Sequence, residues 1–253
     1  MTALLETRDL CRSFGALPVT QHVNLSLEAG ARHALIGPNG AGKTTLVDQL
    51  TGVLAPTSGR VLIDGVDVTR LPVEARVRRG LSRTFQINSL FPHLTPLEAV
   101  TAAMLERDRD TAGPIGRWLG GVSRNAAQLD EAQALLDTLG LARDRDVPTH
   151  ELAYGRQRIL EIALALAARP RVLLLDEPAA GVPEGESDEL FAVLDGLPSD
   201  VAMLLIEHDM SLVFRFAKRI TVLVAGTELV TGTPDEIAAD PRVREVYLGR
   251  GRH

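Results

Sequence analysis

The amino-acid sequence predicts an α/β fold, in which strands and helices alternate along the chain and most strands run parallel in one sheet. Four short apolar runs have the length of strands and are bounded by polar residues, glycine or proline; they are Arg32–Ile36, Val172–Leu175, Val201–Ile206 and Ile220–Val224. These runs are continuous rather than alternating, which is typical of strands buried on both faces of a parallel sheet. Helical patterns accompany them, at Thr44–Leu54, Arg156–Ala168 and about 184–197. This alternation is typical of a doubly wound α/β core.

The middle of the chain predicts a lobe made of helices. Thr95, Pro96 and Glu98 have the spacing of an N-cap, a first helical position and a capping box, and the same pattern recurs at 233–236. A further helix is indicated by apolar residues on one face before Gly140, namely Leu129, Ala132, Leu135, Leu136 and Leu139. The polar, glycine-rich segment 107–125 is expected to be a loop or insertion. We therefore assign residues 1–86 and 169–253 to an α/β core and 87–168 to a helical lobe.

The charge balance argues against a nucleic-acid-binding protein. The 253 residues include 27 Lys and Arg against 33 Asp and Glu, which gives a formal net charge of −6. Sequence-independent binding to nucleic acid depends on neutralising phosphates, so a mildly acidic chain is a poor candidate for it. We expect no nucleic-acid partner, although a local basic patch could form from Arg76, Arg78, Arg79 and Arg83.

Cysteine content and hydropathy restrict the chain further. Cys11 is the only cysteine, so the chain can form neither an internal disulfide nor a cysteine-based metal site, and we expect a buried structural thiol. No apolar run approaches the ~20 residues needed to cross a bilayer. The first ten residues, MTALLETRDL, lack the apolar region of a signal peptide. We therefore expect the chain not to span a membrane itself.

A phosphate-binding loop is the strongest motif in the sequence. The segment GPNGAGKTT follows the first apolar run and precedes a helical pattern; its residues are Gly37, Pro38, Asn39, Gly40, Ala41, Gly42, Lys43, Thr44 and Thr45. Glycines let backbone N–H groups surround phosphate oxygens, and the following helix adds the positive end of its dipole. Lys43 would contact the β and γ phosphates, and the Thr44 hydroxyl would ligate Mg²⁺.

Two acids and a histidine follow other predicted strands. Asp176 and Glu177 end the run that begins at Val172, and His208 comes shortly after the run that ends at Ile206. The carboxyl ends of parallel strands share one edge of a sheet, so these side chains are expected to meet the phosphate loop. Asp176 is the candidate for holding Mg²⁺, Glu177 for activating water as general base, and His208 for contacting the γ-phosphate. Taken alone, the acid pair would be read as a solvated turn and the histidine as structural.

Two more segments resemble motifs of the ABC ATPases. Residues 152–158, LAYGRQR, resemble the signature usually written LSGGQ, and residues 83–86, RTFQ, resemble the Q-loop. The motifs occur in the order of that family, and the resemblance covers nearly the whole chain. The stretches RTFQINSLFPHLTPLEAV, LAYGRQRILEIALALA, LLLDEPAAG and VREVYLG are similar to one branch, the ATP-binding subunits of branched-chain amino acid importers.

This resemblance implies a fold and a site. The fold would be a P-loop NTPase (RecA-like) core with a mostly parallel sheet, an N-terminal antiparallel β portion and an inserted α-helical lobe. Two ATPase subunits would sandwich two ATP molecules, so that Ala153, Tyr154 and Gly155 act on the partner's nucleotide. Gln86 would contact the attacking water or Mg²⁺ together with Thr44 and Asp176. Phe14 resembles the aromatic residue that stacks on adenine, and a core-edge aromatic is the alternative.

Three residues depart from the family pattern. Ala153 stands where the signature usually has serine, Arg156 where it has glutamine, and Pro183 where the branch usually has asparagine. The first removes one hydroxyl contact to the γ-phosphate. None of the departures affects Lys43 or the acids, so hydrolysis is expected to be retained.

The function that the resemblance implies is an ATPase subunit on the cytoplasmic face of the inner membrane, with ATP and Mg²⁺ as cofactors. Its partners would be two polytopic membrane subunits, a second ATPase subunit and, indirectly, an extracytoplasmic solute-binding protein. Branched-chain amino acids are the expected substrates, with urea, amides or aromatic acids as alternatives. A soluble ABC ATPase of translation or DNA repair, and a P-loop GTPase or kinase, are the competing functions; the sequence has no N-K-x-D motif for reading guanine.

Overall fold

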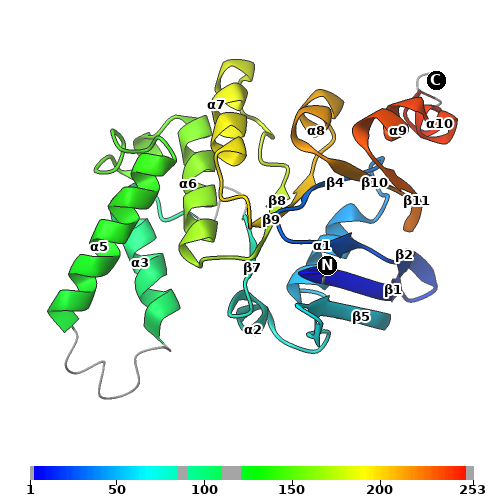
Figure 1. Ribbon diagram of the computed structural model, residues 1–253, viewed down its shortest axis with the longest axis horizontal. Coiled ribbons are helices and arrows are strands. Elements are labelled where there is room, and N and C mark those ends of the chain that lie inside the picture. Colours follow the sequence, from blue (N-terminus) through cyan, green and yellow to red (C-terminus); the bar gives the residue numbers. More distant parts are fainter. Residues whose placement is uncertain (1–2, 85–89, 110–120, 249–253) are drawn as a thin grey trace. The chain divides into compact units, whose positions relative to one another are not determined.

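The computed structural model describes residues 3–84, 90–109 and 121–248, and the chain forms two compact units (Figure 1). The first unit comprises Met1–Arg83, Arg171–Glu177 and Pro198–His253. The second comprises Thr84–Pro170 and Pro178–Leu197. The sequence predicts 178–197 as part of the α/β core, but this segment groups with the helices because its helix packs on that of residues 154–167.

A six-stranded, mostly parallel sheet organises the first unit. Its order is β11-β10-β4-β9-β8-β7, and only the β10–β11 pair is antiparallel. The strands are β4 (Arg32–Ile36), β7 (Leu81–Arg83), β8 (Val172–Asp176), β9 (Ala202–Ile206), β10 (Arg219–Val224) and β11 (Thr227–Gly232). Each of the four predicted apolar runs is one of these strands, so the predicted parallel core is confirmed.

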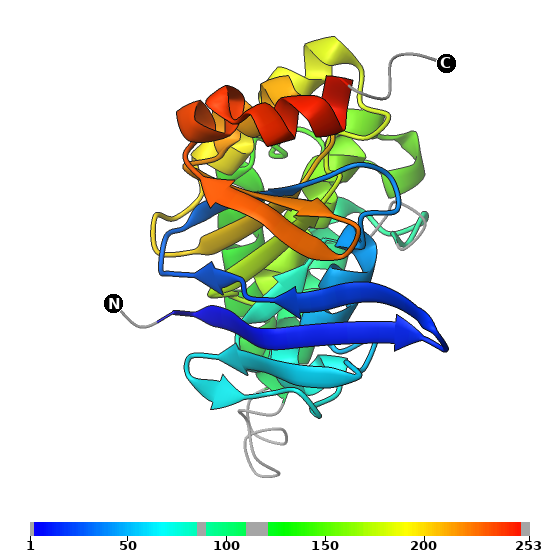
Figure 2. The same ribbon diagram turned by 90° about the vertical axis from the view of Figure 1, so that its right-hand side faces the viewer.

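An antiparallel sheet forms the other layer of this unit. Its order is β2-β1-β5-β6, with β3 paired to β1, and Figure 2 shows β1 and β2 in blue beside β5 in cyan. The strands are β1 (Leu5–Phe14), β2 (Leu17–Val23), β3 (Ser26–Leu27), β5 (Ser58–Ile63) and β6 (Val66–Asp67). Apolar side chains of this sheet, such as Leu5 and Leu10, share one buried core with Leu35 of β4 and Leu46 of the following helix. The N-terminal antiparallel portion is therefore confirmed.

Short helices complete the first unit: α1 (Lys43–Thr51), α2 (Val73–Val77), α8 (Met210–Phe216), α9 (Pro234–Ala239) and α10 (Pro241–Leu248). The Asp209 side chain caps α8 by accepting hydrogen bonds from two backbone N–H groups. The capping box predicted at Thr233 and Glu236 is present at the start of α9. Among the described helices of the chain, none is long and apolar enough to cross a membrane.

Arg76 is buried rather than part of a basic surface patch. Its side chain is 1% exposed, and its guanidinium donates to the carbonyls of Gln49, Leu50, Thr69 and Leu71 at 2.7–3.1 Å. Two of these carbonyls belong to the last turn of α1, where backbone acceptors lack partners within the helix. The expected basic patch is wrong at this residue, because its charge stabilises the end of α1.

The described part of the second unit contains helices and no strand: α3 (Pro96–Arg109), α5 (Gly121–Thr138), the 3₁₀ turn Thr149–Glu151, α6 (Tyr154–Ala167) and α7 (Glu184–Asp195). The predicted capping box is confirmed, because the Thr95 N–H donates to the Glu98 carboxylate at 2.9 Å and the Glu98 N–H donates to the Thr95 hydroxyl at 3.2 Å.

Two sequence expectations need correction. The segment 107–125 is helical at both ends, since α3 reaches Arg109 and α5 begins at Gly121; the residues between these helices lie outside the described part. Arg107, near the end of α3, forms ion pairs with Asp108 at 2.7 Å and with Glu131 at 2.9 Å, an arrangement that residue composition does not reveal.

The sequence predicts a buried thiol at Cys11, but this residue is only half-buried, and its sulfur accepts the His22 N–H at 3.2 Å.

His33 lies inside the first unit and makes its stability depend on pH. The side chain on β4 is 3% exposed, and Nε2 is 2.8 Å from the Thr221 hydroxyl. Burial, assisted by the nearby charge of Arg219, lowers the pKa of His33 from 6.5 to about 4. The native state thus keeps His33 neutral in a range where the unfolded chain binds a proton, and stability falls as the pH falls through this window.

We predict that the free energy of unfolding of His33→Gln falls less steeply as the pH is lowered than that of the wild-type chain. The wild-type chain should lose about 3 kcal/mol more than the variant between pH 6.5 and pH 4, because only the wild type has this histidine to protonate on unfolding. Urea unfolding at several pH values measures the difference. His22→Gln is the control, since the His22 side chain is 78% exposed. Equal pH profiles for wild type and His33→Gln would contradict the assignment.

Candidate functional site

The phosphate loop joins the end of β4 to the start of α1, as predicted. Gly37 is buried, and a Cβ there would overlap the Leu223 carbonyl oxygen of β10. Gly42, with φ +97°, faces the Val19 carbonyl oxygen of β2 in the same way. Gly40 has φ +79° and no neighbour within 4 Å of an added Cβ. Two glycines are thus required by crowding and the third by backbone conformation.

Hydrogen bonds to a turn elsewhere in the first unit hold this loop. The Ala41 N–H donates to the Pro38 carbonyl at 3.1 Å, and the Ala41 carbonyl accepts from Gly226 N–H at 3.0 Å. Gly226 belongs to the β10–β11 turn, and its own carbonyl accepts from Gln21 of β2 at 2.7 Å. The loop is therefore tied to both sheets.

Lys43 lies across the loop that precedes it. Its ammonium donates to the carbonyls of Gly37 at 2.7 Å and Pro38 at 3.2 Å. Burial lowers the pKa of Lys43, while the carboxylates of Glu177 and Asp176 act in the opposite direction. Asn39, Gly40 and Thr44 are exposed, and Thr45 is half-buried. The loop thus presents backbone and hydroxyl groups to solvent around a single ammonium group.

The acids and the histidine lie at the same edge of the parallel sheet as the loop. β4, β9 and β8 are neighbours, Asp176 is the last residue of β8, and the Glu177 N–H donates to the Ile206 carbonyl of β9 at 2.9 Å. Glu177 has φ +45°, an uncommon conformation for a residue with a side chain. His208 Nδ1 is 3.7 Å from a Glu177 carboxylate oxygen. The structure therefore brings the predicted pair together, and their catalytic roles stay predictions.

Glu207 and Arg83 also belong to this edge, although the sequence did not indicate either of them as a site residue. Glu207 is 1% exposed, accepts the His208 N–H at 3.0 Å and has a carboxylate oxygen 3.6 Å from His208 Nδ1. Its position directly after an apolar run was the available signal. The local basic patch that could include Arg83 is not formed by this residue, because its side chain is only 20% exposed.

Arg83 bridges two carboxylates of the first unit. It donates to Asp176 Oδ2 at 2.6 Å through Nη2 and to Asp48 Oδ1 at 2.7 Å through Nη1. Burial disfavours its charge, but the hydrogen bonds to Asp176 and Asp48 outweigh this effect and raise the pKa of Arg83. The acid predicted to hold Mg²⁺ is therefore already paired with a fixed cation.

Phe14 and Gln86 are the two predicted nucleotide contacts that remain, and the structure describes only the first of them. Phe14, at the end of β1, is 49% exposed, and the Arg12 guanidinium lies 4.7 Å from its ring centroid. The exposed ring is available to a planar ligand, and stacking on adenine stays a prediction. Gln86 lies outside the described residues.

The signature-like segment forms the N-terminus of α6 in the second unit. Ala153 is the N-cap, and the Gly155 N–H donates to a Glu186 carboxylate oxygen of α7 at 2.8 Å. The Tyr154 hydroxyl donates to the Ala180 carbonyl at 3.1 Å and accepts from Arg158 at 3.1 Å. A carboxylate thus already lies on the helix terminus that the resemblance assigns to a phosphate of the partner subunit.

Two of the departures from the family pattern have structural partners within this unit. Arg156 contacts the Glu189 carboxylate at 3.0 Å and donates to the Gly140 carbonyl at 2.9 Å. Pro183 is the N-cap of α7, where a missing N–H costs no helical hydrogen bond. Both residues therefore fit the helices that carry them.

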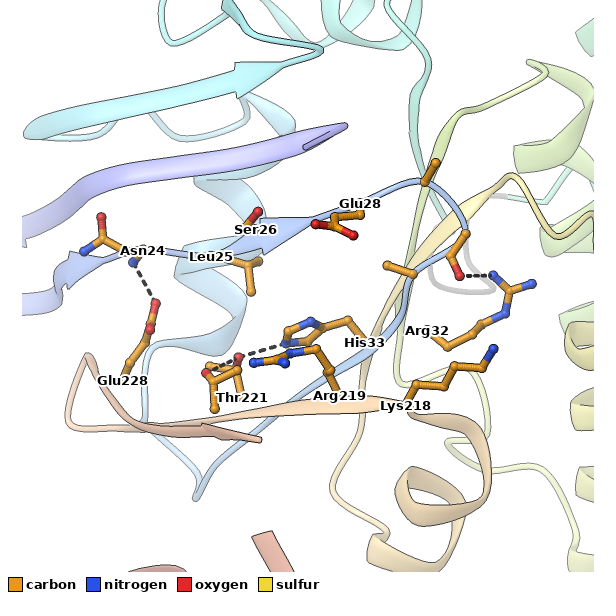
Figure 3. Close-up of a pocket in the computed structure, with 14 residues that line it drawn as sticks. Asn24, Leu25, Ser26, Glu28, Arg32, His33, Lys218, Arg219, Thr221 and Glu228 are labelled. Carbon is orange, nitrogen blue, oxygen red and sulfur yellow. Dashed lines mark hydrogen bonds between the residues drawn. The ribbon is translucent and has the colours of Figure 1, made fainter. Parts of the chain in front are cut away.

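A separate pocket lies at the amino-terminal ends of β4 and β10, away from the phosphate loop. It has a volume of about 480 Å³, and Figure 3 shows His33, Thr221 and Arg219 on its wall. The phosphate loop follows the carboxyl end of β4, whereas this pocket includes the first residues of the strand. The pocket is thus distinct from the loop and the acids described above.

The donor set at the sheet edge fits a nucleotide with a divalent cation. The loop offers backbone N–H groups, the start of α1 and an ammonium group, which together suit a chain of phosphates. The Thr44 hydroxyl is exposed and makes no hydrogen bond to any described residue, so it is available as a ligand. A hydroxyl and the carboxylate of Asp176 are oxygen ligands of the kind that Mg²⁺ prefers.

Comparisons with known proteins agree with this site. Residues 20–180 match the family model of ABC transporters, and residues 229–253 match the model described as branched-chain amino acid ATP-binding cassette transporter. The chain is 39% identical to the high-affinity branched-chain amino acid transport ATP-binding protein BraF of Pseudomonas aeruginosa, over 97% of this chain and 98% of that protein. It is also 39% identical to LivG of Escherichia coli, which has the same description and the same coverage.

A solved structure supports the same assignment. The ADP conformation of MJ1267, an ATP-binding cassette of an ABC transporter, superposes with a TM-score of 0.82 at 26% identity, covering 99% of this chain and 100% of that one. By fold, by nucleotide motifs and by identity over almost its whole length, the chain belongs to the ATP-binding proteins of ABC transporters, which are ATPases.

Proposed function

We propose that the chain is the ATP-hydrolysing subunit of an ABC importer for branched-chain amino acids or closely related small solutes. The observation that carries the catalytic part is the arrangement of Lys43, Asp176, Glu177 and His208 around the carboxyl ends of β4, β8 and β9. Support for the substrate class comes from BraF and LivG, whose names specify branched-chain amino acid transport, and from the match at residues 229–253. Urea, amides and aromatic acids are the alternative substrates.

Nucleotide binding would begin at the phosphate loop. Backbone N–H groups of residues 37–45, other than the proline at position 38, would surround the phosphates. The ammonium of Lys43 would exchange the carbonyls of Gly37 and Pro38 for phosphate oxygens. Thr44, Asp176 and Gln86 would hold Mg²⁺, which neutralises charge on the phosphates when bound. Phe14 would support the adenine ring. We expect no large rearrangement of the loop, because its contacts with β2, β10 and Gly226 already fix its path.

Hydrolysis would depend on the carboxylate of Glu177. Its side chain is 46% exposed, so water can reach it, and its strained backbone is fixed by the bond to Ile206. As general base it takes a proton from the attacking water. His208, 3.7 Å from the Glu177 carboxylate and anchored through Glu207, orients that water and contacts the γ-phosphate, with Gln86 completing the set.

Transport would require partners that carry the membrane pathway. The proposed assembly has two polytopic membrane subunits, a second ATPase subunit and an extracytoplasmic solute-binding protein that docks on the membrane subunits. The chain would lie peripherally on the cytoplasmic face of the inner membrane. Ala153, Tyr154 and Gly155 would meet the nucleotide of the other ATPase subunit, so that closure of the pair couples ATP binding to the membrane subunits.

Association distinguishes this function from that of a soluble, non-transport ABC ATPase. We predict that the tagged chain, purified from detergent-solubilised membranes, is recovered with two polytopic subunits. Mass spectrometry of the purified complex identifies them, and a parallel preparation without detergent is the control. Recovery with ribosomes or DNA in place of membrane subunits would overturn the transport role.

We predict that Glu177→Gln retains ATP binding and lowers ATP turnover by at least about a hundredfold, because the amide cannot accept the proton of water. Binding is measured with a fluorescent ATP analogue and turnover by phosphate release. Glu74→Gln, on the exposed surface of α2, should leave both unchanged. Near-normal turnover of Glu177→Gln would remove Glu177 from the role of base.

A second pair of variants tests the shape of the loop. Gly37→Ala should abolish measurable ATP binding, because the added methyl group overlaps the Leu223 carbonyl and forces the loop to move. Gly40→Ala meets no neighbour and pays only the strain of positive φ, about 1 kcal/mol, so its affinity should fall no more than roughly tenfold. Nucleotide titrations of the folded variants make the comparison. If both variants bind equally well, contact with β10 does not set the geometry of the loop.

A further inference from the structure

Arg83, Asp48 and Asp176 form a chain of three charges in the first unit. Arg83 ends β7, Asp48 lies in α1 and Asp176 ends β8, so the three residues come from separate parts of the sequence. The ion pairs measure 2.7 Å to Asp48 and 2.6 Å to Asp176. The side chains are 20%, 28% and 15% exposed in the order Arg83, Asp48, Asp176. These are short, charge-assisted hydrogen bonds with limited access to water.

The geometry fixes the guanidinium between the two acids. Arg83 uses a different nitrogen for each carboxylate, Nη1 for Asp48 and Nη2 for Asp176. A planar fork held at both terminal nitrogens cannot turn away from one partner without losing the other. Asp48 therefore anchors Arg83 beside Asp176. The anchor lies on α1, the helix that begins at Lys43 of the phosphate loop.

This arrangement bears directly on the metal proposed for the site. Asp176 is the carboxylate that would face Mg²⁺, and its Oδ2 already accepts from a fixed cation. A divalent cation approaching Asp176 is attracted by that carboxylate and repelled by Arg83, and partial burial strengthens both effects. The backbone of Asp176 is held independently by the pairing of β8 with β9, which includes Asp176 with Ile206. Charge, more than orientation, is thus what Arg83 contributes.

We propose that Arg83 acts through Asp176: it compensates the charge of that carboxylate and thereby raises the Mg²⁺ concentration required for metal-dependent nucleotide binding. The inference rests on the proposed ATP-binding function. The carboxylate of Asp176 is paired with Arg83 in the nucleotide-free protein, so Mg²⁺ would bind there together with the nucleotide phosphates rather than alone. The neighbouring Asp48 limits the effect by sharing the charge of Arg83.

The test is a Mg²⁺ titration of nucleotide binding, measured with a fluorescent ATP analogue. The analogue is kept at one concentration for all variants, so that the Mg²⁺–nucleotide complex forms in solution to the same extent in each titration. Arg83→Gln should lower the Mg²⁺ concentration at half-saturation roughly tenfold, because the competing charge is gone. Arg83→Lys keeps the charge but not the fork that bridges both acids, so its midpoint should lie closer to that of wild type than to that of Arg83→Gln. Binding measured in EDTA provides the metal-free baseline.

A charge-matched variant guards against misfolding. Arg83→Gln removes the cation that bridges the two carboxylates, whereas Arg83→Gln combined with Asp48→Asn removes one charge of each sign. The three-residue group of the wild type sums to −1, and so does that of the double variant, in which only Asp176 is charged. The double variant should return the Mg²⁺ midpoint toward the wild-type value. Circular dichroism confirms that each protein is folded before titration.

The outcomes separate this inference from the proposed function. An unchanged midpoint in Arg83→Gln, or a midpoint that moves to higher Mg²⁺, overturns charge compensation while leaving ATP binding intact. A double variant that behaves like Arg83→Gln also overturns it, because the effect would not then follow the local charge. Absence of ATP binding by the wild-type protein, with and without Mg²⁺, overturns the proposed function itself and the inference with it.

Discussion

The parallel register of β4, β9 and β8 is the constraint on which the site depends. Ile206 of β9 is paired with Leu35 of β4 on one side and with Asp176 of β8 on the other. The three strands therefore end at one level, and the segments that follow them emerge side by side. A slip of one residue in either pairing would turn the side chains at the strand end to the other face of the sheet. The buried aliphatic residues of the strands prevent such a slip, because every position in β9 is inside the protein.

Most of this framework was predictable from the sequence, and the physical reason is local. Continuous apolar runs, a glycine-rich loop followed by a helix and two capping boxes each involve residues close together in the chain, and each was found where expected. The convergence of Asp176, Glu177 and His208 on the loop also followed, because the carboxyl ends of parallel strands share an edge. The sequence did not predict how far α3 extends. Its last residues are polar and look like a loop, but Arg107 among them forms an ion pair with α5.

The rest of the site could not be predicted because its contacts join distant residues. Arg83 and Asp176 are separated by 93 positions, and Arg76 reaches carbonyls 26 and 27 positions away. An arginine in a sequence looks like a surface residue, since charged side chains are rarely buried unless they find partners. Only the fold supplies those partners. Glu186 is a similar case, since nothing near it in the sequence indicates a bond to Gly155.

The contacts around the phosphate loop have a thermodynamic consequence. Gly37 lies against β10, Gly42 lies against β2, and Ala41 is bonded to the turn at Gly226, so strands from both sheets determine the path of the loop. Its backbone entropy is therefore lost when the chain folds and not when a ligand binds. A loop that is already ordered loses less conformational entropy when a ligand binds, so more of the contact energy contributes to affinity. Strands that do not themselves contact the phosphates can therefore affect how tightly phosphates bind. The C-terminal hairpin β10–β11 is in this sense a determinant of ligand affinity, although it lies more than 170 residues beyond the loop in the sequence.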